Sequence, residues 1–175
     1  MPAVPRYRLI LLRHAKSAWP ENVADHDRPL AERGRKAAPL IGAYMAREKL
    51  IPDLALVSPA RGARETWDIV RKDLPKTITH RDAPGIYEVP VEAILEVIRA
   101  VEPGVRTLLL VGHNPGMEDL AALLAKTGEG EALERMAEKF PTGGLAVIDL
   151  AVERWDAISA GTGFLERFVM PRSIG

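Results

Sequence analysis

The chain has 175 residues, of which 47% are hydrophobic and 27% are charged, the usage of an ordinary globular protein. Lysine plus arginine equal aspartate plus glutamate at 24 each, so we expect neither a nucleic-acid partner nor attraction to an anionic membrane surface. The absence of cysteine excludes a disulfide framework, a zinc-thiolate site and a thiol nucleophile. This length favours one compact domain over residues 1–175.

The N-terminal apolar run at 9–12 is too short for the hydrophobic region of a signal peptide, and Arg13 closes it. No stretch of the sequence approaches the length of a membrane span. We therefore expect a cytoplasmic protein with no membrane partner.

Short apolar runs alternate with helical patterns along the chain. Runs such as "RLILL" are typical of strands covered on both faces, whereas Val91, Ile94, Leu95 and Ile98 form the stripe of an amphipathic helix. Pro39 should kink the first helix or shift its start. In chain order, we expect a strand over 8–12, a helix over 30–50, a strand over 54–58, helices over 61–72 and 90–101, a strand over 107–111, a helix over 116–128, a loop at 128–130 before a short helix, and strands over 144–150 and 163–170.

This alternation predicts an α/β fold, a three-layer α/β/α sandwich with a largely parallel central sheet. Three of its strands end in unusual polar groups. The first is followed by Arg13 and His14, the second by Arg61 and Arg64, and the third by His113. Because ligands collect beyond the carboxyl ends of parallel strands, these side chains should converge on one anion.

Phosphate is the natural candidate, because guanidinium groups bind phosphoryl oxygens bidentately and helix N-termini offer free N–H groups. Ser58-Pro59 and Asn114-Pro115-Gly116 should start two such helices. The sequence contains neither GxxxxGK[ST] nor GxGxxG, so it has no nucleotide-binding phosphate loop. The remaining chemistry is nucleophilic: a neutral imidazole attacks phosphorus while arginines stabilise the charge on the phosphoryl oxygens. Nearby guanidinium groups should lower the pKa of that histidine.

Several residues allow a structural interpretation as well as a functional one. Arg64 either binds the anion or serves as a surface or helix-packing group. Asp25-His26-Asp27 is either a metal site or, in preference, a solvated loop, because consecutive side chains seldom converge on one ion. Trp19 either walls the pocket or packs, and His80 is most simply a polar residue near a strand end.

The segments "LLRHAKSAW", "DHDRPLAERGRKAA", "SPARGARET" and "LLLVGHNPG" occur in order and resemble the histidine phosphatase superfamily, specifically its small SixA-like phosphohistidine phosphatase branch, with a phosphoglycerate mutase-like fold. The resemblance implies that His14 is the nucleophile, that Arg13 beside it binds the phosphoryl group, and that Arg61 and His113 belong to the phosphate pocket. It also implies a metal-independent phosphatase with no cofactor.

The sequence departs from many relatives after the Arg-His pair, where Ala15-Lys16-Ser17 replaces Gly-Glu-Thr or Gly-Glu-Ser. Lys16 and Ser17 are candidate phosphate ligands, although Lys16 could equally be solvated. The superfamily commonly supplies a general acid from a later segment, and here Glu88 is the best-placed carboxylate. Its alternative role is to favour the dipole of the helix that follows.

The resemblance implies a phosphorylated protein, carrying phosphohistidine, as the preferred substrate. Two alternatives stay open. A phosphatase of small phosphomonoesters would use the same chemistry, and a non-catalytic module that binds phosphorylated ligands would keep the arginines without turnover.

Overall fold

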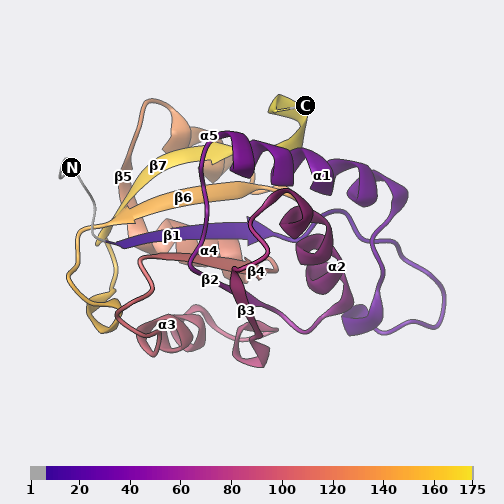
Figure 1. Ribbon diagram of the computed structural model, residues 1–175, viewed down its shortest axis with the longest axis horizontal. Coiled ribbons are helices and arrows are strands. Elements are labelled where there is room, and N and C mark those ends of the chain that lie inside the picture. The colour runs from indigo at the N-terminus through magenta and orange to yellow at the C-terminus, as the bar shows by residue number, and fades with distance from the viewer. Residues whose placement is uncertain (1–6, 175) are drawn as a thin grey trace.

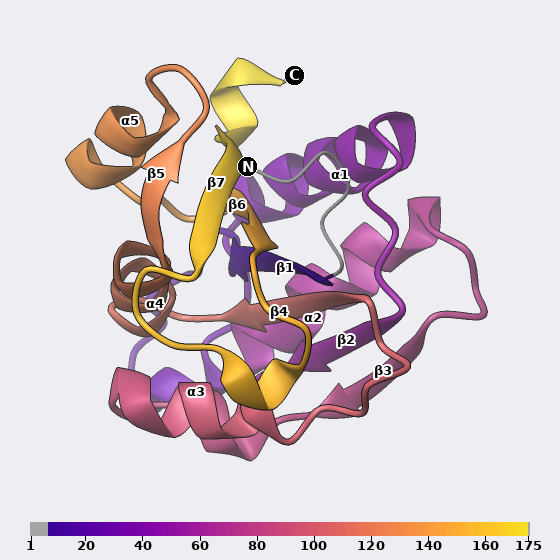
Figure 2. The ribbon, with the colours of Figure 1, turned by 90° about the vertical axis from the view of Figure 1, so that its left-hand side faces the viewer.

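The computed structural model describes residues 7–174, which form one seven-stranded sheet with helices on both faces (Figure 1). The strand order is β3-β2-β4-β1-β6-β7-β5, and Figure 2 shows this succession across the sheet. The elements are β1 (Tyr7–Arg13), α1 (Glu32–Arg47), β2 (Leu54–Val57), α2 (Arg61–Val70), β3 (Thr79–Asp82), α3 (Val91–Arg99), β4 (Thr107–Gly112), α4 (Gly116–Leu124), β5 (Ala125–Gly128), α5 (Ala132–Glu138), β6 (Leu145–Leu150) and β7 (Gly163–Val169).

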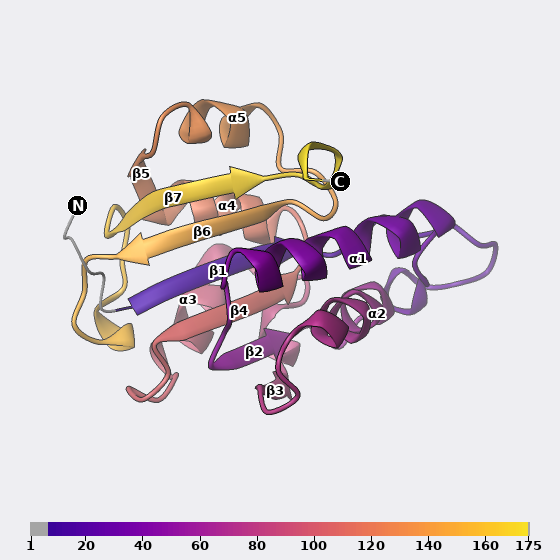
Figure 3. The same cartoon turned by 45° about the horizontal axis from the view of Figure 1, so that its top comes forward.

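The sheet is the middle layer of three. Figure 3 shows α1 and α2 lying across one face, where they cover a cluster that includes Ile41, Met45 and Trp67. Helices α3, α4 and α5 pack on the other face over a second cluster that includes Ile94 and Leu120. The central strands β1 and β4 contribute alternate side chains to both clusters, which is why residues 9–12 and 108–111 are all apolar.

Strand β1 pairs in parallel with β4, and β4 pairs in parallel with β2. Strand β6 runs antiparallel to both of its neighbours, β1 and β7. The sheet is therefore largely parallel, as predicted, with β6 reversed. The carboxyl ends of β1, β2 and β4 consequently meet at one edge, which is the condition for the predicted convergence of polar groups.

Two segments differ from the sequence-based expectation. Strand β3 was not predicted because all four of its side chains are exposed: it is an edge strand that pairs with β2 alone, so no apolar pattern marks it. The helix expected over 116–128 ends at Leu124, and residues 125–128 instead form β5 beside β7. Thr127 and Gly128 are weak helix formers, and pairing with β7 decides their conformation.

Pro39 lies inside α1, which begins at Glu32, so the proline does not set the start of the helix. The short helix expected after 128–130 is α5. Within residues 7–174, no helix has the length and apolar character needed to cross a membrane.

Candidate active site

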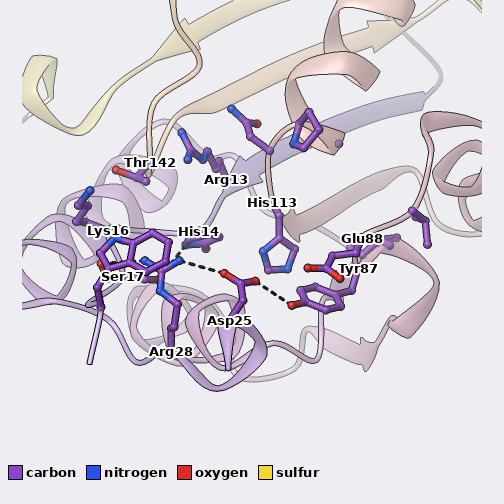
Figure 4. A pocket seen from close by; sticks show the side chains of 16 residues that line it. Arg13, His14, Lys16, Ser17, Asp25, Arg28, Tyr87, Glu88, His113 and Thr142 are labelled. Atoms are coloured by element: carbon purple, nitrogen blue, oxygen red, sulfur yellow. Dashed lines mark hydrogen bonds and ion pairs between the residues drawn. The ribbon is translucent and has the colours of Figure 1, made fainter. Parts of the chain in front are cut away.

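A cavity of about 390 Å³ opens at the sheet edge formed by the ends of β1 and β4 (Figure 4). It brings together six of the site residues predicted from the sequence, namely Arg13, His14, Lys16, Ser17, Glu88 and His113. Trp19 also lines it. The remaining lining residues are Asp25, Arg28, Ile86, Tyr87, Val89, Asn114, Pro115, Gly116 and Thr142.

His14 follows the last residue of β1, and its backbone is held on both sides. Its N–H donates to the carbonyl of Gly112 at 2.9 Å, and its carbonyl accepts from the N–H of Gly143 at 3.1 Å. Its Nδ1 lies 2.7 Å from the carbonyl oxygen of Ala15. Because a carbonyl can only accept, Nδ1 carries the proton in the neutral ring, and Nε2 keeps its lone pair.

The pKa of His14 is lowered from its ordinary value, chiefly because the ring is buried. The bond to Ala15 acts in the opposite direction, and the charges of Arg13 and Arg28 lower the pKa further. The site therefore favours a neutral imidazole with a free nitrogen, which is the form that can attack an electrophile.

Arg13 supplies positive charge next to this nitrogen. One terminal nitrogen donates to the carbonyl of Phe140 at 3.0 Å, while the buried Nε has no hydrogen-bond partner among the described residues. Burial lowers the pKa of the guanidinium. A buried N–H without a partner is costly, and an anion in the adjoining cavity would supply one.

His113 lies across the cavity from His14, with the ring centroids 5.1 Å apart. Its Nε2 is 2.6 Å from the hydroxyl of Ser58, a fully buried residue that follows β2. Burial, and then the proximity of His14, lower the pKa of His113 to about 4. Two neutral imidazoles therefore face one space.

Three further residues line the cavity, Asp25, Arg28 and Tyr87, and the sequence analysis did not place them there. Asp25 accepts hydrogen bonds from the Tyr87 hydroxyl at 2.8 Å and from Arg28 at 3.1 Å (Figure 4). Arg28 also donates to the carbonyls of Ala18 and Ser17, and its guanidinium carbon lies 3.2 Å from the centroid of the Trp19 ring. The loop at 25–27 is thus part of the site, and "DHDRPL" was the sequence signal for it.

The hydrogen bonds determine what Asp25 can do. Tyr87 and Arg28 lower the pKa of the Asp25 carboxyl, with the tyrosine hydroxyl having the larger effect. The pKa of Tyr87 is raised, by burial and then by the bond to Asp25. Asp25 accordingly remains an anion that holds Arg28 in place, and neither group is poised to donate a proton.

The prediction that Arg61 lies in this cavity is wrong. Arg61 is half-exposed at the start of α2, where it pairs with Glu65 at 2.9 Å, and it does not line the cavity. The next residue, Gly62, is the one that faces the site, since a β-carbon there would lie 2.8 Å from Ser17 Oγ and 3.5 Å from His14 Nδ1. One residue on a helix rotates a side chain by 100°, which accounts for the difference.

Arg64 is exposed and donates to the carbonyl of Pro59, which agrees with its alternative role as a surface group. Lys16 lines the cavity from an exposed position at its rim, whereas Ser17 is buried with its hydroxyl 3.4 Å from His14 Nδ1. Figure 4 shows Lys16 and Ser17 on the same side of the cavity.

Glu88 lines the cavity from a strained backbone conformation, with φ of 52°. Such a conformation is unfavourable for a residue other than glycine and is often retained at functional sites. The first helical residue of α3 is Val91, and no side chain caps its N-terminus. Glu88 is therefore not the cap of α3.

The described residues contain no group of three or more His, Asp or Glu side chains arranged to hold a metal ion. At 25–27, Nδ1 of His26 lies 3.3 Å from a carboxylate oxygen of Asp27. Positive charge at the cavity comes from Arg13, Lys16 and Arg28.

Comparison with known proteins agrees with this geometry. The family model described as histidine phosphatase superfamily (branch 1) matches residues 9–148. An uncharacterized protein of Mycobacterium tuberculosis (strain H37Rv) is 40% identical over 163 residues, covering 92% of this chain and 100% of that protein.

Two solved structures are also similar, both assigned as candidate phosphohistidine phosphatases named SixA. The one from Agrobacterium tumefaciens has a TM-score of 0.77 and 34% identity, covering 97% of this chain and 100% of that chain. The one from Nakamurella multipartita has a TM-score of 0.82 and 25% identity, covering 94% of this chain and 96% of that chain. A cavity with two facing imidazoles, together with a family match over most of the sequence, identifies this chain as a member of the histidine phosphatase superfamily, with SixA structures among its neighbours.

Proposed function

We propose that this protein is a phosphohistidine phosphatase that works through a phosphorylated His14 and requires no metal ion. The observation that carries the proposal is the 2.7 Å hydrogen bond from His14 Nδ1 to the carbonyl of Ala15. It holds the tautomer in which Nε2 is free, beside an arginine with an unpaired buried N–H. A nucleophile and a charge-stabilising donor thus adjoin the same cavity.

In the first step, the lone pair of His14 Nε2 forms a bond to phosphorus, and the bond between phosphorus and the leaving group breaks. When the leaving group is the imidazole of a substrate phosphohistidine whose other ring nitrogen already carries a proton, it takes the electron pair of the P–N bond and departs as neutral imidazole, with no further proton delivered. Arg13 and Arg28 stabilise the negative charge on the phosphoryl oxygens as they pass through the transition state.

In the second step, water attacks the phosphorus of phosphorylated His14. The P–N bond breaks, Nε2 recovers its lone pair, and inorganic phosphate leaves. His113 lies on the far side of the cavity from His14, where its neutral ring can bond to a phosphoryl oxygen or to the attacking water.

The substrate class is supported by the 34% identity to a SixA of Agrobacterium tumefaciens over its whole length. The cavity is also wide: its lining runs from Trp19, which is 74% exposed, to Glu88 and Thr142. An opening of this kind admits a side chain that projects from another protein.

A second candidate is a phosphatase of small phosphomonoesters, and the observation that favours it is the position of Glu88 in the cavity. An alkoxide leaving group needs a delivered proton, whereas an imidazole leaving group depends on it less. The two candidates share the first covalent step, so they differ in leaving group alone.

The decisive experiment is to incubate the protein with a ³²P-labelled phosphohistidine protein and quench during turnover. We expect label on His14 that is labile in acid and stable in alkali, and none in His14→Ala. The control His80→Ala changes a histidine of the edge strand β3 and should retain labelling. Binding without label or turnover would identify a non-catalytic module, and loss of turnover with a chelator would contradict metal independence.

A further inference from the structure

A second cavity, of about 470 Å³, adjoins the active site, and Arg13, Lys16 and Thr142 line both. We call it the basic groove. It runs between the start of α1, the segment after α5 and the C-terminal turn at Pro171–Ser173. Its other lining residues are Arg33, Ala37, Lys139, Pro141, Met170, Pro171 and Arg172.

The groove is lined by five cations and no carboxylate. The cations are Arg13, Lys16, Arg33, Lys139 and Arg172. The active-site cavity differs, since Asp25 and Glu88 line it together with its cations. Because the chain as a whole has a net charge of zero, this is a local concentration of positive charge.

None of the five cations forms an ion pair with another residue in the part of the chain from 7 to 174. Their neighbours on α1 behave differently: Lys36 pairs with Glu32 at 3.2 Å, and Arg35 lies 3.8 Å from Glu65. Unneutralised like charges repel and destabilise a compact state. Ion pairing within the fold therefore does not account for this cluster, whereas an anionic ligand does.

We propose that the basic groove binds an acidic segment of the protein whose phosphohistidine enters the active site; this inference rests on the proposed function. The groove adjoins the active site, since Arg13, Lys16 and Thr142 line both cavities, so a chain whose phosphohistidine enters the active site passes next to the groove. A single phosphoryl group needs the active-site cavity alone.

The walls of the groove favour a polypeptide over a small molecule. Arg33, Lys139 and Arg172 are exposed on three different segments, so they can meet carboxylates spaced along a chain. Half-buried Ala37 and Met170 lie between them and offer apolar contacts to the same segment. Complementary charge of this kind both speeds association and selects the partner.

The test compares two phosphohistidine peptides that differ only in flanking residues, acidic in one and neutral in the other, with phosphoimidazole as a small reference. The groove variant combines Arg33→Gln, Lys139→Gln and Arg172→Gln. The control Lys36→Gln removes a cation from the same helix that pairs with Glu32 and lies outside the groove.

We expect wild type to have a higher kcat/KM for the acidic peptide than for the neutral one. In the groove variant the ratio of these two values should be about tenfold smaller, as three weak ion pairs imply. Lys36→Gln should keep the preference, and salt should weaken it. The Tm of the groove variant should be equal or higher at low salt, whereas a structural role for these cations would lower it.

Equal turnover of the two peptides by wild type would overturn the proposal, and so would an unchanged preference in the groove variant. A small bisphosphate serves as a fourth substrate, and a loss in the groove variant confined to it would overturn the proposal and assign the groove to a small molecule. Failure of wild type to hydrolyse phosphoimidazole would count against the proposed function. Binding of the unphosphorylated acidic peptide to wild type and to the groove variant then still tests the groove.

Discussion

The Nε2 atom of His113 lies 2.6 Å from the hydroxyl oxygen of Ser58, which also accepts a hydrogen bond from the N–H of Ala60. The hydroxyl thus joins the ends of β2 and β4 beneath the active site. Since Ser58 is fully buried, no water can take over its bond to the imidazole. Ser58 therefore positions His113 and leaves Nδ1 as the ring nitrogen available to a ligand.

Replacing Ser58 with alanine should lower kcat about fivefold, because a net hydrogen bond of about 1 kcal/mol that orients His113 is lost. The effect should fall on kcat more than on KM and should change the acid side of the pH–rate profile. Ser159→Ala, at an exposed position, is the control. A loss of stability with unchanged kinetics would assign Ser58 to packing.

Arg28→Ala should lower kcat/KM by about a hundredfold or more, the effect of removing a preorganised donor from a charged transition state. Arg61→Ala should lower kcat/KM much less, because Arg61 pairs with Glu65 outside the cavity. Steady-state kinetics on the same phosphoramidate decides between them. The reverse order of effects would show that Arg61 moves into the cavity when substrate binds.

The acid side of the pH–rate profile should have its midpoint below pH 6.5, the ordinary pKa of an imidazole, because burial lowers the pKa of His14. The profile of kcat/KM, corrected for ionisation of the substrate, measures this midpoint. An NMR titration of His14 should agree, with a peptide of residues 12–17 as reference. A midpoint at or above the value of that peptide would contradict the argument.

The stability of the fold should also depend on pH, through His113. The pKa of His113 is about 4 in the folded protein against an ordinary 6.5, so between these values the unfolded chain binds more protons. The free energy of unfolding should therefore decrease as the pH falls through this window. Denaturant titrations of wild type and His113→Gln measure the difference, which should be smaller in the variant.

Glu88→Gln should slow hydrolysis of alkyl phosphate esters far more than hydrolysis of phosphohistidine, since only the alkoxide depends on a delivered proton. The measurement is kcat/KM for both substrates in both proteins, and Glu92→Gln on α3 serves as a control outside the cavity. Equal losses would defeat the leaving-group argument. No loss on either substrate would remove Glu88 from the reaction.

Gly34→Ala should destabilise the protein by about 1–3 kcal/mol, as overpacking does. A β-carbon there would overlap the carbonyl oxygen of Lys16, where α1 approaches the active-site loop. Because the backbone of Lys16 must give way, activity should also fall. Gly104→Ala, which meets nothing within 4 Å, should leave both unchanged. Thermal unfolding and turnover of the two variants provide the comparison.

Sequence alone predicted the central strands well, because residues 9–12 of β1 and 108–111 of β4 are buried on both faces and all apolar. It also placed His14 and His113 at one edge, since parallel strands share the direction of their ends. It failed at Arg61, because a shift of one residue on a helix is enough to turn a side chain out of a cavity.

The loop at 25–27 was misjudged for a different reason. Asp25 owes its place to a hydrogen bond with Tyr87, 62 residues further along the chain, and a contact of that range leaves no local periodicity. Strand β3 and strand β5 were missed for the same reason, since each is defined by its partner strand.

The backbone of His14 is tied to Gly112 on one side and to Gly143 on the other, while its ring is tied to Ala15. With three anchors, the nucleophile has little freedom to advance during the reaction. The phosphorus atom must then move instead, away from a leaving group at the mouth of the cavity and toward the fixed nitrogen of His14. Such a site should discriminate among substrates by how closely the leaving group can approach His14 before its bond to phosphorus breaks, so that bulk near the phosphorylated atom, more than bulk at a distance, limits the rate.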